Sequence, residues 1–455
     1  MTDSELKREV ERAENMAMHL SAHCTLFDGY YDDGNGLEQA QIDPDCFFTS
    51  WNELFEKADE LYGFLKQLVK RMYGRGGRMM ANKAYKFRIY PNKEQEELIQ
   101  KTFGCVRFVY NHFLADRKEA YETSKESRTM FQQNKLLTVL KKENEWLQEP
   151  DKNALQYALR DLNTAYQNFF RNIKKGVNLG FPKFKSKKSD RKSYSTTGYD
   201  GITRIEGDKI HFPKLGDVKA SISRQIPENH RIISATISQN ASGKYFVSLL
   251  TEYDFTPTEV PIHPENSLDL DYSSPHFYVD SENQTADMPH FYRESEKKLA
   301  REQRKMSKMV KGSNNWKKQK IRVARAYEKV RNQRTDWQQK QSTILANQYD
   351  MIAVEDIDYQ AMGRGLRLAK ATNDNSFGQF RSFLDYKMNE RGKKLVTIDK
   401  WFPSSKTCRF CGAVSSELKL TDRTWICLSC GERIERDLNA AINIKNQGLT
   451  LLGII

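Results

Sequence analysis

The chain has 455 residues, of which 38% are hydrophobic, 11% aromatic and 29% charged, and its formal net charge is +13. It lacks an apolar run of ~18 residues that could cross a membrane, and it begins without the basic and apolar segments of a secretory signal. The aromatic content excludes a disordered chain. We therefore expect a multidomain cytoplasmic protein with no membrane contact.

Positive charge is unevenly distributed along the chain. Residues 1–79 contain 9 Lys or Arg against 15 Asp or Glu. Residues 171–192 hold nine basic residues and one acidic residue, and residues 293–340 hold seventeen basic and five acidic residues. A basic surface is a statement about partners, and the most abundant polyanion in a cytoplasm is nucleic acid.

The first segment, residues 1–79, is predicted to be an acidic helical extension. Apolar residues recur at helical spacing in 51–72, and the segment ends in the glycine-rich joint 74–78. Such an extension could widen a nucleic-acid-binding lobe, mimic nucleic acid, or mediate contact with a protein partner or a second copy. The sequence leaves these three roles open.

The next part of the chain alternates between strand and helix patterns. Residues 84–90 alternate apolar and polar side chains and are predicted to form a strand. Three helices and then several short strands follow. Together they predict a β-barrel formed by 80–92 and 178–262, interrupted by a helical lobe at 93–177. The helices are expected at 94–121, 130–143 and 153–175, and the short strands within 202–252.

The C-terminal half mixes buried strands with helices, which predicts an α/β domain over 263–404 and 434–455. A long basic helical region is expected between the second and third predicted strands of this domain. The strands are expected at 268–271, 277–279, 351–357 and 394–398, and the helices at 292–349, 377–391 and 436–446. A cysteine module at 405–433 interrupts the domain.

Two Cys-x2-Cys pairs carry the metal prediction: Cys408 with Cys411, and Cys427 with Cys430. Two such knuckles can surround one ion tetrahedrally, and the glycine after each pair provides the required backbone freedom. This spacing favours one structural Zn²⁺ over a redox role. Four protein ligands leave no open position for chemistry.

Three acidic residues have unusual contexts. Asp271 and Glu355 each end an apolar strand, and Asp437 begins a helix. Carboxylates that face each other across a sheet edge repel unless cations lie between them. Two Mg²⁺ ions there would support hydrolysis of a phosphodiester. Solvated strand ends, and a favourable position at the helix dipole for Asp437, are the alternative interpretation.

The motifs AYKFRIYPNKEQ, FVYNHFL, DYSSPHFYVDS, VEDIDYQAM, FPSSKTCRFCG, WICLSCG and RDLNAAINI, in this order, resemble the TnpB (OrfB) proteins of insertion sequences, relatives of miniature type V CRISPR effectors. The resemblance covers 83–448, about 80% of the chain. It implies a wedge β-barrel (80–92 and 178–262) with a helical recognition lobe. It also implies a RuvC-like (RNase H-fold) nuclease domain with an inserted zinc ribbon that binds target nucleic acid.

The resemblance also implies particular functional residues. Asp271, Glu355 and Asp437 would be the RuvC acids and Mg²⁺ ligands, although Asp269 stands where the family usually has glycine. Glu435 stands where the family often has aspartate. A helical Lys-x3-Gln that contacts the motif adjacent to the target in some relatives is matched by Lys152 and Gln156, for which surface polarity is the alternative.

The function implied is an RNA-guided, Mg²⁺-dependent DNA endonuclease with a guide RNA and target double-stranded DNA as partners. The two basic stretches would hold RNA and heteroduplex phosphates. The alternatives are an RNA-guided repressor that binds without cutting, a CRISPR-type effector descended from TnpB, a strand-joining transposase and a zinc-ribbon transcription factor. The three acids favour cutting over repression.

Overall fold

The computed structural model describes residues 79–176, 180–188, 192–255, 258–272, 276–357, 376–416, 418–419 and 422–455. The predictions for residues 1–78, and those for parts of the basic stretch 171–192, lie outside the described residues. The chain divides into two compact units. Residues 1–81 with 253–256 form one unit, and the other holds nearly all of the described helices and strands.

The first sheet has seven strands in the order β2-β6-β7-β1-β5-β4-β3. The pairings of β1 with β5, β2 with β6 and β6 with β7 are antiparallel, as are those of β4 with β3 and β5. The short strands expected after 202 are present, whereas the strand pattern predicted no strand at the position of β2. The strands are β1 (Met79–Tyr90), β2 (Lys192–Thr197), β3 (Arg204–Glu206), β4 (Lys209–Phe212), β5 (Gly216–Ser221), β6 (Arg231–Gln239) and β7 (Tyr245–Phe255).

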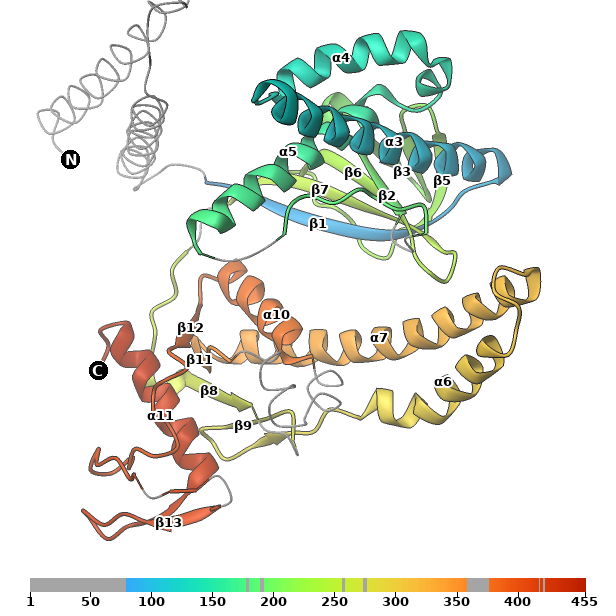
Figure 1. The fold of residues 1–455 in the computed structure, drawn as a ribbon. Coiled ribbons are helices and arrows are strands. Elements are labelled where there is room, and N and C mark those ends of the chain that lie inside the picture. Colours follow the sequence, from blue (N-terminus) through green and yellow to red (C-terminus); the bar gives the residue numbers. More distant parts are fainter. Residues whose placement is uncertain are drawn as a thin grey trace, which may run out of the picture. The chain divides into compact units, whose positions relative to one another are not determined.

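Three helices follow β1: α3 (Lys93–Ser124), α4 (Met130–Glu143) and α5 (Lys152–Lys174). Helices α3 and α5 pack on the sheet at β2, and α4 packs against α5. Helices α3 and α4 begin at capping boxes, Asn92 with Gln95 and Thr129 with Gln132, which satisfy backbone donors that the first turn leaves unpaired. One continuous apolar core includes residues of both the helices and the sheet. The helical lobe and the strands are therefore one packed body, as Figure 1 shows for α3 and α5.

The second sheet has five strands in the order β10-β9-β8-β11-β12. Strand β11 pairs in parallel with β8 and β12, and β9 is antiparallel to both β8 and β10. The predicted mixed α/β arrangement is therefore present. Its strands are β8 (Ser267–Tyr272), β9 (Tyr278–Asp280), β10 (Thr285–Ala286), β11 (Met351–Glu355) and β12 (Lys394–Ile398).

Both faces of this sheet are covered. One apolar core joins β8, β9 and β11 to α7 (Asn314–Gln348) and α10 (Phe377–Glu390), and another joins β11 and β12 to α11 (Arg436–Leu451). At the second face, a Cβ on Gly448 would come 2.9 Å from the Cβ of Ala353. Glycine at this position therefore allows α11 to lie close against β11, where Figure 1 shows it in red.

The single helical region expected at 292–349 is two helices, α6 (Phe291–Ser307) and α7, packed side by side (Figure 1). The break follows from Gly312, whose φ is 90°, and from Ser313, whose hydroxyl accepts from the backbone N–H of Trp316 at 3.1 Å. A left-handed glycine before a capping serine ends one helix and starts the next. None of the described helices is long and apolar enough to span a membrane.

Candidate active site and metal centre

Asp271 and Glu355 lie on neighbouring parallel strands. Leu270 of β8 is paired with Val354 of β11, so the two acids are the next residues at the same end of both strands. The alternation of side chains places Leu268 and Leu270 in the core with α7 and α10, and it turns Asp269 and Asp271 toward the opposite face. That face is the one covered by α11.

The third acid, Asp437, stands in the first turn of α11, which packs against both β8 and β11. Its carboxylate is paired with Arg423, with Nη1 at 3.1 Å from Oδ2. Sequence reasoning expected three separate elements to converge here, and the structure brings all three to the same end of the sheet.

Electrostatic interactions connect the three acids. Burial raises the pKa of Asp271 well above its ordinary value, and the neighbouring charges of Glu355 and Asp437 raise it further. Burial also raises the pKa of Glu355, while the hydroxyl of Ser404 lowers it. Desolvated carboxylates that repel one another are the usual surroundings of a divalent cation site. In the described part of the chain, however, only the four cysteines place three or more ligand atoms within 4.8 Å of one another.

Asp269 differs from Asp271 in its surroundings. It is wholly buried opposite Ala353, and neither of its carboxylate oxygens has a hydrogen-bond partner among the described residues. Burial raises the pKa of Asp269 well above its ordinary value, the nearby Ser281 hydroxyl lowers it, and the charges of Asp271 and Asp280 raise it further. Of the two aspartates on β8, Asp271 is therefore the one that faces the other acids at the strand end.

Sequence reasoning missed three residues that hold the site together. The Ser404 hydroxyl donates to Glu355 Oε1 at 2.7 Å. The side-chain amide of Asn443 donates to the carbonyls of Ser404 and Thr407 at 2.8 and 2.6 Å, and that of Asn439 donates to Thr407 at 2.7 Å. The four-residue spacing of these two asparagines could have indicated a shared role, because it places both on one face of α11.

The four cysteines gather into a cluster that could hold one metal ion, as their spacing predicts. Their sulfurs lie within 4.8 Å of one another, and Cys408–Cys430 and Cys411–Cys427 are both 3.6 Å apart. A tetrahedral ion with ~2.3 Å metal–sulfur bonds requires sulfur–sulfur edges of about 3.8 Å. The backbone N–H of Cys430 lowers the pKa of Cys427 to about 7, which favours the thiolate form that metals bind.

The two knuckles of this centre have matching backbones. The N–H of Gly412 donates to the carbonyl of Cys408 at 2.9 Å, and the N–H of Gly431 donates to that of Cys427 at 2.8 Å. Both glycines have positive φ, 74° and 76°, a conformation that other residues rarely adopt. The short strands β13 (Thr424–Ile426) and β14 (Arg433–Glu435) pair and lead into α11.

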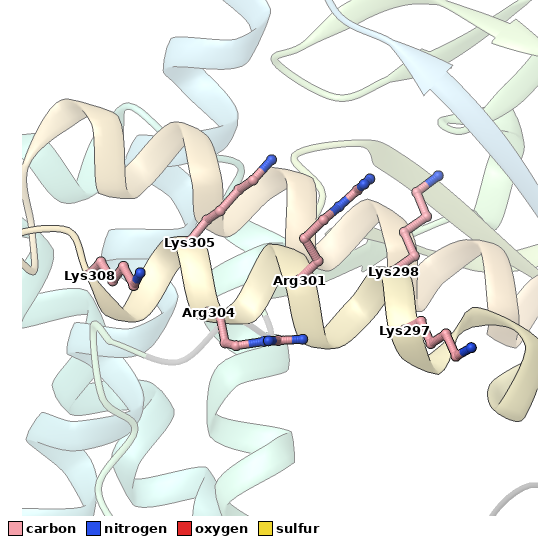
Figure 2. A pocket seen from close by; sticks show the side chains of 6 residues that line it. All are labelled: Lys297, Lys298, Arg301, Arg304, Lys305 and Lys308. Atoms are coloured by element: carbon pink, nitrogen blue, oxygen red, sulfur yellow. The ribbon is translucent and has the colours of Figure 1, made fainter.

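The basic stretch 293–340 distributes its charge over α6, α7 and the loop between them. Six residues line a groove of about 660 Å³, here called the α6 basic groove. Figure 2 shows Lys298, Arg301 and Lys305 extending in the same direction from one face of the helix. Among the described residues, Lys298 has no ion-pair partner, so its charge is available to an anion. The lining residues are Lys297, Lys298, Arg301, Arg304, Lys305 and Lys308.

Lys152 and Gln156 are both exposed, one turn apart at the start of α5. Lys152 lines a groove of about 640 Å³ together with Lys141, Lys142 and Lys214. The predicted pair thus faces solvent beside further positive charge.

Three family profiles match the chain. A helix-turn-helix domain of the OrfB family matches residues 79–126, where the structure has β1 and α3, and a probable transposase matches residues 251–364. A Cas12f1-like TNB domain matches residues 377–444. Among solved structures, a Cas12f1–sgRNA–target DNA complex aligns with a TM-score of 0.46 and 11% identity, covering 81% of this chain and 99% of that one.

Curated relatives match over most of their length. A protein of Streptomyces pristinaespiralis, named as a candidate RNA-guided DNA endonuclease, is 35% identical over 81% of this chain and 89% of its own length. InsQ of Escherichia coli K12, named in the same way, is 30% identical over 81% of this chain and 93% of its own length. Matches of this extent show that the chain belongs to the TnpB (OrfB) family of insertion-sequence proteins.

Proposed function

We propose that the chain is an RNA-guided DNA endonuclease that cuts with one RuvC-like, divalent-metal site. The observation that carries this proposal is the electrostatic coupling of Asp271 to Glu355 and Asp437, which come from two parallel strands and a helix over one end of a sheet. The names of the 35% and 30% identical relatives support the same activity. The five-stranded sheet would be the RNase H-fold core.

The residues at this end of the sheet fit divalent metal ions. Carboxylate oxygens are the hard ligands that Mg²⁺ and Mn²⁺ prefer, and mutual repulsion among desolvated carboxylates is what a cation relieves. Asp271, Glu355 and Asp437 would hold the ions. When bound, such ions activate a water molecule and stabilise charge on the phosphodiester that is cut.

The surrounding residues would orient these ligands. Ser404 keeps Glu355 in one orientation through its hydrogen bond and favours the ionised carboxylate. Arg423 is exposed and holds Asp437 by an ion pair, so it can exchange this contact for a nucleic-acid phosphate. Because hydrogen-bonded ligands need little rearrangement, the site would be largely preorganised.

Guide RNA and target DNA would bind the basic surfaces. The α6 basic groove offers several cations along one helix, a pattern that contacts phosphates without reading sequence. Lys152 and Gln156, beside a second basic groove, would contact the duplex next to the target. The cysteine centre would hold one structural Zn²⁺, because its four thiolates close the coordination sphere.

Coexpression with its native flanking DNA, sequencing of the bound RNA and incubation with matching target DNA test this proposal. We expect one discrete RNA, cleavage that requires Mg²⁺, and no cleavage by Asp271→Asn, Glu355→Gln or Asp437→Asn. Binding without cleavage by the unaltered protein would indicate a repressor, and joined strands a transposase. An RNA derived from a repeat array would indicate a CRISPR-type effector.

A further inference from the structure

Trp401 is the most exposed aromatic residue among those described at the nuclease sheet and the ribbon. It is 80% exposed, in the turn between β12 and the first cysteine knuckle. The Nζ of Lys400 lies 5.0 Å from the centre of its ring. An exposed fraction this high leaves the opposite ring face in solvent. Single exposed apolar residues are common on protein surfaces, so a contact at this ring must be inferred from the groups around it.

The turn that carries Trp401 is fixed on its inner side. The backbone N–H of Trp401 donates to Asp399 Oδ1 at 2.7 Å, and that of Phe402 donates to the Asp399 carbonyl at 3.1 Å. Phe402 packs against the core between the sheet and α11. The indole is therefore presented by an anchored loop. Binding of a partner to it would cost little backbone entropy, because the loop is already ordered.

The same turn leads directly into the active site. Ser404, three residues after Trp401, donates to Glu355. Three residues of chain span at most about 10 Å, which is roughly three nucleotides of a stacked strand. A base stacked on Trp401 would thus belong to a nucleotide close to the phosphodiester at the acids.

Charge and chemistry favour a nucleic-acid strand over a protein as the occupant. Lys400 beside the ring and the exposed Lys406 match phosphates, and Asp399, the acidic group in the turn, is engaged by the backbone N–H of Trp401. The ribbon repeats the combination at Arg409, which lies 4.7 Å from the centre of the exposed Phe410 ring. Aromatic rings beside cations are how single strands are held without sequence preference.

We propose that Trp401 stacks on a base of the unpaired DNA strand and positions that strand for cleavage at Asp271, Glu355 and Asp437. The inference rests on the proposed endonuclease function and adds to it a positioning residue. Loss of one stacked base corresponds to a roughly 5- to 150-fold weaker interaction. Trp401→Phe should keep most of it, because the ring remains.

The test uses the RNA-loaded protein and a 20-nucleotide oligothymidylate in which one thymidine is replaced by 5-iododeoxyuridine. Irradiation should crosslink the strand to the peptide containing Trp401, as read by mass spectrometry. Trp401→Ala should abolish that crosslink and raise KM for cleavage of the unpaired strand. Leu428→Ala is the matched control, because Leu428 is 90% exposed on the same ribbon but cannot stack.

The outcomes separate the two proposals. If the unaltered protein cuts DNA while Trp401→Ala keeps its KM and the crosslink maps elsewhere, the stacking role is wrong and the endonuclease function stands. If the unaltered protein does not cut, the proposed function fails. A change in oligomeric state of Trp401→Ala, with cleavage and crosslinking unchanged, would identify a protein contact and overturn the inference.

Discussion

Replacing Asp269 with alanine should increase the free energy of unfolding at pH 7.5. Its two oxygens are buried without a hydrogen-bond partner among the described residues, which costs about 1–3 kcal/mol. The carboxyl group occupies about the volume of one water molecule, ~30 Å³, and at ~24 cal/mol per Å³ the space left behind costs about 0.7 kcal/mol. The net gain is about 0.3–2.3 kcal/mol.

The gain should grow with pH. Burial favours the protonated form of Asp269 in the folded chain, whereas the unfolded chain ionises near its ordinary pKa of 3.8. As pH rises above that value, ionisation favours the unfolded state by up to about 1.4 kcal/mol per pH unit, until the folded pKa is reached. Below it both states are protonated and the contribution disappears. Alanine removes this loss, and Asp269→Asn should also remove the pH dependence while retaining an unpaired polar group.

The assay is urea denaturation at several pH values between 4 and 8, with zinc present and magnesium omitted. In a separate thermal denaturation at neutral pH, the melting temperature of Asp269→Ala should rise by roughly 1–5 °C. A variant that is less stable than the unaltered protein, with a difference independent of pH, would refute the reasoning. It would show that Asp269 has a stabilising partner. Repeating the titration with Mn²⁺ reports whether the divalent site reaches this residue.

Other perturbations test the neighbouring elements. Gly448→Ala should cost about 1–3 kcal/mol because its Cβ meets Ala353, whereas Gly104→Ala, with open space in α3, should gain about 0.5–1 kcal/mol; equal melting shifts would contradict the packing argument. Ser404→Ala removes the donor that lowers the Glu355 pKa, so the acidic limb of the cleavage–pH profile should move to higher pH. Cys427→Ser should release zinc, measured with a chromogenic chelator, and lower the melting temperature; full metal content would argue against the four-thiolate centre. Charge reversal at three positions of the α6 basic groove should reduce the slope of log K against log[salt] by up to about 0.9 per lost phosphate contact, and an unchanged slope would place the nucleic acid elsewhere.

Local sequence patterns predicted many of the individual helices and strands. The helix at 130–143 and the strand at 394–398 were predicted to the residue, because capping residues and short apolar runs mark their ends. The break between α6 and α7 was missed, since a basic helical pattern continues through Gly312 on both sides. The pairing order of both sheets depends on contacts between distant segments, and local periodicity carries no such information.

The candidate site likewise contains residues that local spacing predicted and contacts that it could not predict. The spacing of the four cysteines predicted a metal centre, because all four ligands can be recognised in the sequence. In the structure their four sulfurs lie close together. The assignment of Asp271, Glu355 and Asp437 came from their positions at strand and helix ends together with the family resemblance, and it remains a proposal that their mutual electrostatics support. The contact of Ser404 with Glu355 could not be predicted, because it depends on how the turn after β12 returns to the sheet.

Asn439 and Asn443 fasten the carbonyls of Ser404 and Thr407 to the helix that begins with Asp437. This clamp of two side-chain amides thus connects three parts of the chain: the loop whose Ser404 contacts Glu355, the first cysteine knuckle, and helix α11. Any change that displaces the first cysteine knuckle would loosen this clamp and disturb the support of Glu355 and Asp437. The proposed cleavage of DNA would then depend on an intact cysteine cluster as well as on the acids themselves.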